Sequence, residues 1–311
     1  KKIGLSALAG SLAVVSANAV ELSVSGKTEV TYVSKETGTV GNPFGMGNSI
    51  TFSGSGDVNG MTATYTAALA DGGQANSNTS ETFASSSLML DMGDLGTVGF
   101  DQGVGEFGVS TIDDKMPYAY EEIWTYVGTS NGLRAAGGTN VLGYKNTIAG
   151  YTLSVELDPG HTGNASVGGS GDGGSTGAGT TDSGMNVALT GSPYEGVTAG
   201  LGLGEEKQDD SQTNATLGGN GNDEKFSTAF ITYAVDKFTL GVQKSSASGG
   251  SVGTSSNEVE IYGVSYQVNE NLAVSYNEMD NDFGDGTLKD GATSSAGGTT
   301  ETTKGLGASY T

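Results

Sequence analysis

The sequence predicts an all-β protein, an antiparallel β-barrel that spans a membrane. Three observations predict it. Segments of alternating apolar and polar residues recur, short and long connections alternate between them, and no run of about 18 apolar residues is present. The segment 151–158 (YTLSVELD) places Tyr, Leu, Val and Leu on one face and Thr, Ser, Glu and Asp on the other. In such a barrel the apolar face meets lipid and the polar face lines a wet interior.

The first 19 residues have the composition of a secretory signal. Lys1 and Lys2 precede an apolar run over 3–15, and Ala17-Asn18-Ala19 supplies the small residues typical of a cleavage site. The apolar run is too short to span a membrane as a helix. We therefore expect cleavage after Ala19, and a mature domain over 20–311 that lies outside the cytoplasm.

Fourteen strands are expected after the signal. The first strand ends at Tyr32, and its polar face includes Lys27 and Glu29. Asn59-Gly60 predicts a tight two-residue hairpin, because both residues tolerate a positive φ. The other strands are expected at 49–57, 61–70, 83–91, 97–101, 139–147, 151–158, 185–190, 197–205, 226–235, 238–244, 258–268, 272–279 and 302–310.

The connections between these strands alternate in length, as they do in outer-membrane barrels. Short turns alternate with the stretches 34–48, 71–80, 102–137, 159–183, 207–222, 246–256 and 280–300. The asymmetry predicts short periplasmic turns and long external loops. Aromatic side chains near strand ends are expected to form girdles between lipid and headgroup, namely Tyr32, Tyr151, Tyr194, Phe238, Tyr266 and Tyr276.

Composition and charge exclude several kinds of function. The net charge of −22 repels nucleic-acid phosphates and attracts cations, and the absence of cysteine excludes disulfides and Cys-based metal or redox sites. His161, the single histidine, lies in a Gly-rich stretch without fixed partners, so no enzymatic activity is expected. We expect no cofactor and no metal centre. The run 280–286 (DNDFGDG) resembles the start of a calcium loop, and suggests at most weak divalent-cation binding by acidic loops.

The chain resembles the Gram-negative general diffusion porins over residues 1–311. The resemblance rests on the signal, on the first-strand sequence 26–32 (GKTEVTY), on 93–98 (GDLGTV) before the fifth strand, and on the long acidic segment after it. It implies a water-filled outer-membrane channel for passive diffusion of ions and small hydrophilic solutes. It also implies a homotrimer surrounded by outer-membrane lipid and lipopolysaccharide.

The resemblance further implies that the third loop folds into the lumen and narrows the pore. Pro117 predicts a helical turn in this loop. The row of arginines usual on the opposite wall in the family is missing, which favours cations. Carried over by position, the acidic side of the constriction is Glu106, Asp113, Asp114, Glu121 and Glu122, and the basic side is Lys27, Arg134 and Lys145.

An alternative is a secreted Gly-rich β protein, such as an adhesin or surface-layer component. Lys27, Glu29 and Glu156 on polar strand faces favour the barrel, because a dry sandwich core would penalise unpaired charges strongly. Family members have sixteen strands and usually end in Phe, whereas this sequence ends at Tyr310-Thr311. We therefore expect fourteen visible strands of sixteen, with a final hairpin of about thirty residues lacking.

Overall fold

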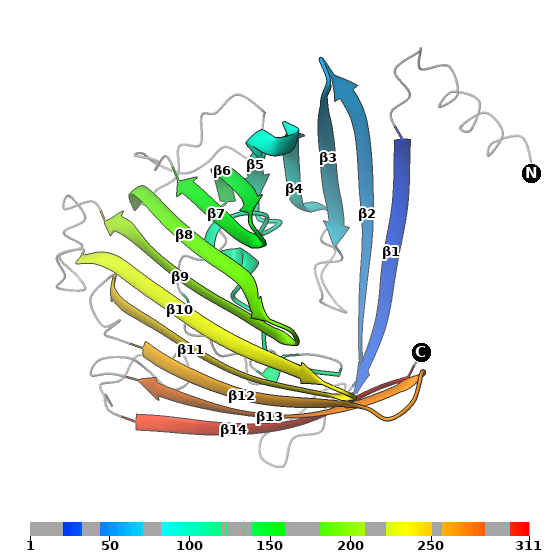
Figure 1. The fold of residues 1–311 in the computed structure, drawn as a ribbon, viewed down its shortest axis with the longest axis vertical. Coiled ribbons are helices and arrows are strands. Elements are labelled where there is room, and N and C mark those ends of the chain that lie inside the picture. Colours follow the sequence, from blue (N-terminus) through cyan, green and yellow to red (C-terminus); the bar gives the residue numbers. More distant parts are fainter. Residues whose placement is uncertain are drawn as a thin grey trace, which may run out of the picture. The chain divides into compact units, whose positions relative to one another are not determined.

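The computed structural model describes residues 21–32, 44–70, 82–119, 122–123, 133, 139–158, 181–208, 222–250, 257–283 and 299–310. These residues hold fourteen antiparallel β-strands together with tight turns and short 3-10 segments (Figure 1). No helix among them is long and apolar enough to cross a membrane. The all-β antiparallel class and the strand count expected from the sequence are confirmed.

The chain divides into two compact units, Lys1–Val104 and Gly105–Thr311. In the first unit each strand pairs with the next one in the chain. The β2–β3 turn has φ of +55° at Asn59 and +81° at Gly60, as the dipeptide predicts. The strands are β1 (Glu21–Tyr32), β2 (Phe44–Val58), β3 (Met61–Ala70), β4 (Thr82–Asp91) and β5 (Thr97–Gln102).

The second unit continues the same hairpin order, and its strands lie side by side from green to red in Figure 1. Its turns include Ala149-Gly150 and Asp236-Lys237, which begin with φ of +53° at Ala149 and Asp236. The strands are β6 (Thr139–Ile148), β7 (Tyr151–Asp158), β8 (Thr181–Tyr194), β9 (Val197–Gln208), β10 (Asn222–Val235), β11 (Phe238–Gly250), β12 (Asn257–Gln267), β13 (Leu272–Phe283) and β14 (Thr299–Tyr310).

Several strands reach further than the sequence pattern predicts. β2 begins at Phe44, β11 continues to Gly250 and β13 to Phe283, all inside stretches expected to be loops. The β11 extension, 245–250, consists only of Ser, Ala and Gly, and the β13 extension begins with Asp280-Asn281-Asp282, so both lack the alternation that marks a strand; the β2 extension alternates Phe44 and Met46 with Gly. Their backbone groups still need partners, and the neighbouring strand supplies them, as where Ser246 lies opposite Glu258.

The two faces of the second unit are inverted relative to a soluble protein. On β7 the side chains of Leu153 and Leu157 are 38% and 43% exposed, whereas Ser154 and Glu156 on the opposite face are 2% and 3% exposed. β8 repeats this with exposed Met185 beside buried Asn186. The apolar face is therefore directed outward, and the polar face is the covered one.

Aromatic side chains lie on the outward face near strand ends. Tyr151, Tyr194 and Phe238 are exposed, and the Phe238 ring lies 4.5 Å from that of Tyr266 between centroids. Further along, the Tyr276 hydroxyl donates to Glu278 at 2.9 Å, so its ring borders the apolar band while its hydroxyl contacts charged residues. This is the placement an interfacial girdle requires; the side chain of Tyr32 lies outside the described part.

Candidate functional site

The segment after β5 crosses the polar face of the second unit and is called here the loop; it is described at residues 105–119 and 122–123. Phe107 anchors its start, because the residue beneath it on β6 is Gly143, where any Cβ would overlap the Phe107 ring. Gly108 follows with φ of +59°, and its position leaves no space for a Cβ either. The loop can therefore approach the sheet closely at these two glycines.

Apolar side chains from the loop make a core against the covered face of the sheet. Val109 and Ile112 are completely buried, and Met116 and Ile123 nearly so. Their partners in the cluster come from β8 and from β10 to β13 and include Ala188, Phe226, Phe230, Ala247, Val259, Ile261 and Met279. The hydrophobic core of the unit thus lies between the loop and the sheet.

Hydrogen bonds from polar side chains of the sheet hold the backbone of the loop. At its start Gly108 N donates to Ser154 Oγ at 2.8 Å, and Val109 N donates to Asn186 Oδ1 at 2.7 Å. The Asn186 amide also donates to Glu156 at 3.0 Å, so the buried carboxylate has a partner. These side chains come from the polar alternates of β7 and β8.

Gln243 on β11 holds the middle of the loop. Its Nε2 donates to the carbonyl oxygens of Ile112 and Asp113 at 3.1 and 3.2 Å, and its Oε1 accepts from Lys115 N at 3.3 Å. The side chain is 2% exposed. One buried amide therefore satisfies three backbone groups that would otherwise lack partners.

The end of the loop is held by β13, and this corrects one prediction. Asn277 Nδ2 donates to Pro117 O at 3.1 Å, and Ala119 N donates to Ser275 Oγ at 2.9 Å. Residues 117–119 are not helical, so the helical turn expected at Pro117 is wrong. Side chains of the sheet capture the backbone groups that a helix would pair internally. Among the described residues of the loop, 3-10 conformation occurs at Gly108–Thr111 and at Ile123.

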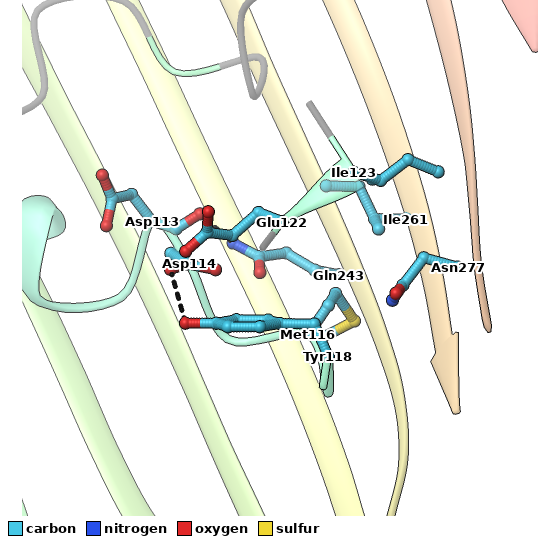
Figure 2. A pocket seen from close by; sticks show the side chains of 9 residues that line it. All are labelled: Asp113, Asp114, Met116, Tyr118, Glu122, Ile123, Gln243, Ile261 and Asn277. Atoms are coloured by element: carbon cyan, nitrogen blue, oxygen red, sulfur yellow. Dashed lines mark hydrogen bonds between the residues drawn. The ribbon is translucent and has the colours of Figure 1, made fainter. Parts of the chain in front are cut away.

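Three of the expected acidic residues gather in one place, called here the acidic pocket (Figure 2). Asp113, Asp114 and Glu122 lie on one side with Tyr118, whose hydroxyl donates to Asp114 Oδ2 at 3.4 Å. Apolar side chains close the other side, and the cavity between them measures about 10 Å³, the space of about one water molecule. The lining is Asp113, Asp114, Met116, Tyr118, Glu122, Ile123, Gln243, Ile261 and Asn277.

Burial changes the charge that this pocket carries. Loss of hydration raises the pKa of Asp113 from 3.8 to about 6, although the positive charge of Lys115 opposes the rise. Burial, a hydrogen bond to Glu122 and the charge of Glu122 raise the pKa of Asp114 to about 8. Burial and the nearby carboxylates also raise the pKa of Tyr118. At neutral pH Asp114 is therefore mostly protonated, whereas Asp113 is mostly ionised.

Glu106 stands apart from the acidic pocket, because it pairs with the predicted basic residue Lys145. The ammonium of Lys145 on β6 lies 2.8 Å from Glu106 Oε2 and 5.7 Å from the centre of the Phe107 ring. Both charged side chains are about one-third exposed. The pair adds a charged contact beside the aromatic anchor, worth up to about 1 kcal/mol at such exposure.

The other predicted site residues lie elsewhere or outside the described part. Lys27 lies in β1 of the first unit, where its backbone is in register with Ser49; its side chain is not described. Glu121, Arg134 and His161 lie outside the described residues. Asp280 to Phe283 belong to β13 rather than to a calcium loop, and Asp280 accepts from Thr302 at 2.6 Å. The described residues contain no group of three or more acidic or histidine side chains arranged to hold a metal ion.

Sequence reasoning missed the residues that position the loop. Gln243, Asn186 and Asn277 read as ordinary polar alternates of their strands, although each holds a loop backbone group. The available signal was size, because on the polar face of each strand these amides are longer than the Gly or Ser residue two positions before them. Tyr118 was also missed as a member of the acidic cluster.

This architecture resembles that of known proteins, both in sequence family and in solved structures. A family model described as Gram-negative porin matches residues 4–311. OmpF of Salmonella typhi, solved in complex with daunomycin, is 16% identical with a TM-score of 0.64, over 93% of this chain and 85% of that chain. An anion-selective porin from Comamonas acidovorans is 16% identical with a TM-score of 0.50, over 93% and 99% of the two chains. A search of curated protein sequences found no match.

Proposed function

The chain belongs to the Gram-negative porin family, and from that premise we propose that its channel prefers cations. Porins are outer-membrane channels and not enzymes, so ions and small hydrophilic solutes cross by passive diffusion through a water-filled lumen. Selectivity in such a channel comes from the side chains at its narrow part. The docked loop is the element that narrows the lumen in this proposal.

The observation that carries the proposal is the acidic pocket on the loop. Asp113, Asp114 and Glu122 lie together, whereas Lys145, the residue of the expected basic side whose side chain is described, is already paired with Glu106. An unbalanced group of carboxylates raises the local concentration of cations and repels anions. The overall net charge of −22 acts in the same direction.

Similarity in fold does not tell whether this channel prefers cations or anions, so the prediction depends on its own charged residues. The porin from Comamonas acidovorans is described as anion-selective, and at 16% identity its likeness to this chain is one of fold. The acidic pocket and the Lys145–Glu106 pair are therefore the basis for predicting cation preference.

Reversal potentials in planar bilayers under a KCl gradient test the proposal. We expect the wild-type channel to prefer K⁺, and the double substitution Asp113→Asn with Glu122→Gln to lower the K⁺/Cl⁻ permeability ratio by roughly two- to threefold. Glu195→Gln, in the exposed β8–β9 turn, removes one carboxylate away from the loop and is the control. Anion preference of the wild type, or an equal effect of the control, would contradict the proposal.

We also propose that residues 1–19 are removed on export and that the channel assembles as a homotrimer in contact with lipopolysaccharide. N-terminal sequencing of protein from outer membranes should begin at Val20, and native mass measurement in detergent should give three chains. The alternative of a secreted Gly-rich protein predicts recovery from the soluble fraction, without the heat-modifiable migration of a barrel.

A further inference from the structure

A second and larger cavity, called here the basic cavity, borders the first half of the loop. It measures about 270 Å³ and is lined by residues of the loop and of β6 to β10. Lys115 comes from the loop, Lys145 from β6 and Phe230 from β10. None of its nine lining residues is acidic. The acidic pocket, in contrast, is lined by Asp113, Asp114 and Glu122.

The two lysines give this cavity an excess of positive charge. Lys145 contacts Glu106 at 2.8 Å, but an ammonium has three donors, so two remain for another acceptor. Lys115 is exposed, and its backbone is fixed by the hydrogen bond to Gln243. The carboxylates that act on these lysines are Glu106, Asp113 and Asp114, which lie outside the lining.

Hydroxyl groups cover the strand wall of the same cavity. Thr152 on β7 lies opposite Thr190 on β8, and Thr198 on β9 adds a third hydroxyl. Each hydroxyl can donate and accept, which suits a ligand that itself carries several hydroxyls. The volume is close to the lower end of the roughly 300–1,000 Å³ of small-molecule sites, so the ligand is small.

Phe230 adds an apolar surface to this polar wall. Its ring occupies the space above Gly200 on β9, where a Cβ would collide with it, and is 5% exposed. A rigid aromatic side chain beside a few polar groups is the usual composition of a site that orients a ring-shaped solute. A sugar ring offers a face of C–H groups for this contact and hydroxyls at its edge.

We infer that the basic cavity is a binding subsite for monosaccharides that carry one anionic group, such as a carboxylate or a phosphate ester. The inference rests on the proposed channel function and names a solute class for it. The ammonium groups of Lys115 and Lys145 would bind the anionic group, the threonine hydroxyls the sugar hydroxyls, and Phe230 the ring face. A channel with overall cation preference would then retain acidic sugars at one local position.

Solute block of single-channel K⁺ currents at low salt tests the subsite. Glucuronate and glucose 6-phosphate are the acidic probes, and glucose is the neutral one. We expect saturable block by the acidic probes with a half-blocking concentration at least threefold below that of glucose. Block by both acidic sugars indicates recognition of charge, and block by glucose 6-phosphate alone indicates a phosphate site. Equal block by glucose, or no saturable block by either acidic sugar, would overturn the inference.

Two substitutions should shift the block in opposite directions. Lys115→Gln removes one ammonium and is expected to weaken block roughly three- to tenfold. Glu106→Gln releases Lys145 from its ion pair and is expected to strengthen block about twofold or more, an effect that a folding defect would not produce. Lys225→Gln removes an outward-facing lysine that is 65% exposed, and should leave conductance and block unchanged.

The controls separate this inference from the proposed selectivity. Weaker block in Glu106→Gln, or equal weakening by Lys225→Gln and Lys115→Gln, would show a bulk charge effect and overturn the subsite. Lack of block in a channel that still prefers K⁺ overturns the subsite alone. Saturable block in a channel that prefers Cl⁻ overturns the selectivity proposal alone.

Discussion

The acidic pocket and the basic cavity border the same loop, yet their charged side chains are of opposite sign and lie in spaces of very different size. In the acidic pocket three carboxylates crowd around about 10 Å³ against Met116, Ile123 and Ile261, and burial neutralises part of their charge. In the basic cavity two lysines face about 270 Å³ lined largely by hydroxyls, with no carboxylate in the lining. A count of charged residues along the loop therefore overstates the acidic side.

The largest effect is expected from removing the anchor that both sites share. Gly143→Ala places a Cβ where the Phe107 ring lies, and such overpacking costs about 1–3 kcal/mol. The start of the loop should detach, which opens the basic cavity and loosens the acidic pocket together. We expect larger and noisier single-channel currents and a lower melting temperature.

Gly305→Ala on β14 is the matched control for this substitution. Its new Cβ would meet Ile123 at 3.6 Å, an ordinary contact, so current and melting temperature should stay near the wild type. If both alanines behaved alike, Phe107 would not be the anchor that sets the loop.

A smaller effect is expected from Gln243→Met, because it keeps the shape and removes the hydrogen bonds. Three loop backbone groups lose their partner, and we expect loop docking to weaken by about 1–3 kcal/mol. Current noise should rise, with a steeper loss of selectivity than of solute block, because Gln243 lines the acidic pocket and not the basic cavity.

Gln267→Met tests whether that effect is specific. Gln267 also donates its amide to backbone carbonyls, those of Asn269 and Leu272, but in an exposed turn. Its replacement should leave the current noise unchanged. A matching rise in noise would mean that any lost side-chain amide, rather than the clamp on the loop, perturbs the channel.

The smallest effect at neutral pH is expected from Asp114→Asn, since Asp114 is mostly protonated there. Its pKa of about 8 lies above the ordinary 3.8, so the native state holds a proton that the unfolded chain releases between these values. Docking of the loop is thus most favourable at low pH and weakens as pH rises from about 4 to 8. Cation preference should increase over the same range as Asp113 and then Asp114 ionise.

Reversal potentials between pH 5 and 9 measure this change. Asp114→Asn should abolish the step near pH 8 and retain the step near pH 6. Asp282→Asn, exposed on the outward face of β13, should retain both steps. If the change in permeability near pH 8 persisted in Asp114→Asn, it would come from the ionisation of another group and not of Asp114.

The strand pattern was predictable wherever one face is apolar. The expected strand 151–158 matches β7 at both ends, and Asn59-Gly60 adopts the expected turn. The prediction failed where only small residues follow one another, as from Ser245 to Gly250 of β11, because the alternation disappears while the backbone still pairs. The sequence of one segment does not show that its backbone will pair with a strand elsewhere in the chain.

The sequence by itself determined the all-β class, the outward apolar face and the acidic character of the loop, because these depend on residue type and on a period of two. Only the tertiary structure decided which carboxylates act together. It placed Glu106 against Lys145, grouped Asp113 and Asp114 with Glu122, and held the loop with Gln243. Such contacts join residues far apart in the chain, and burial then sets their charge.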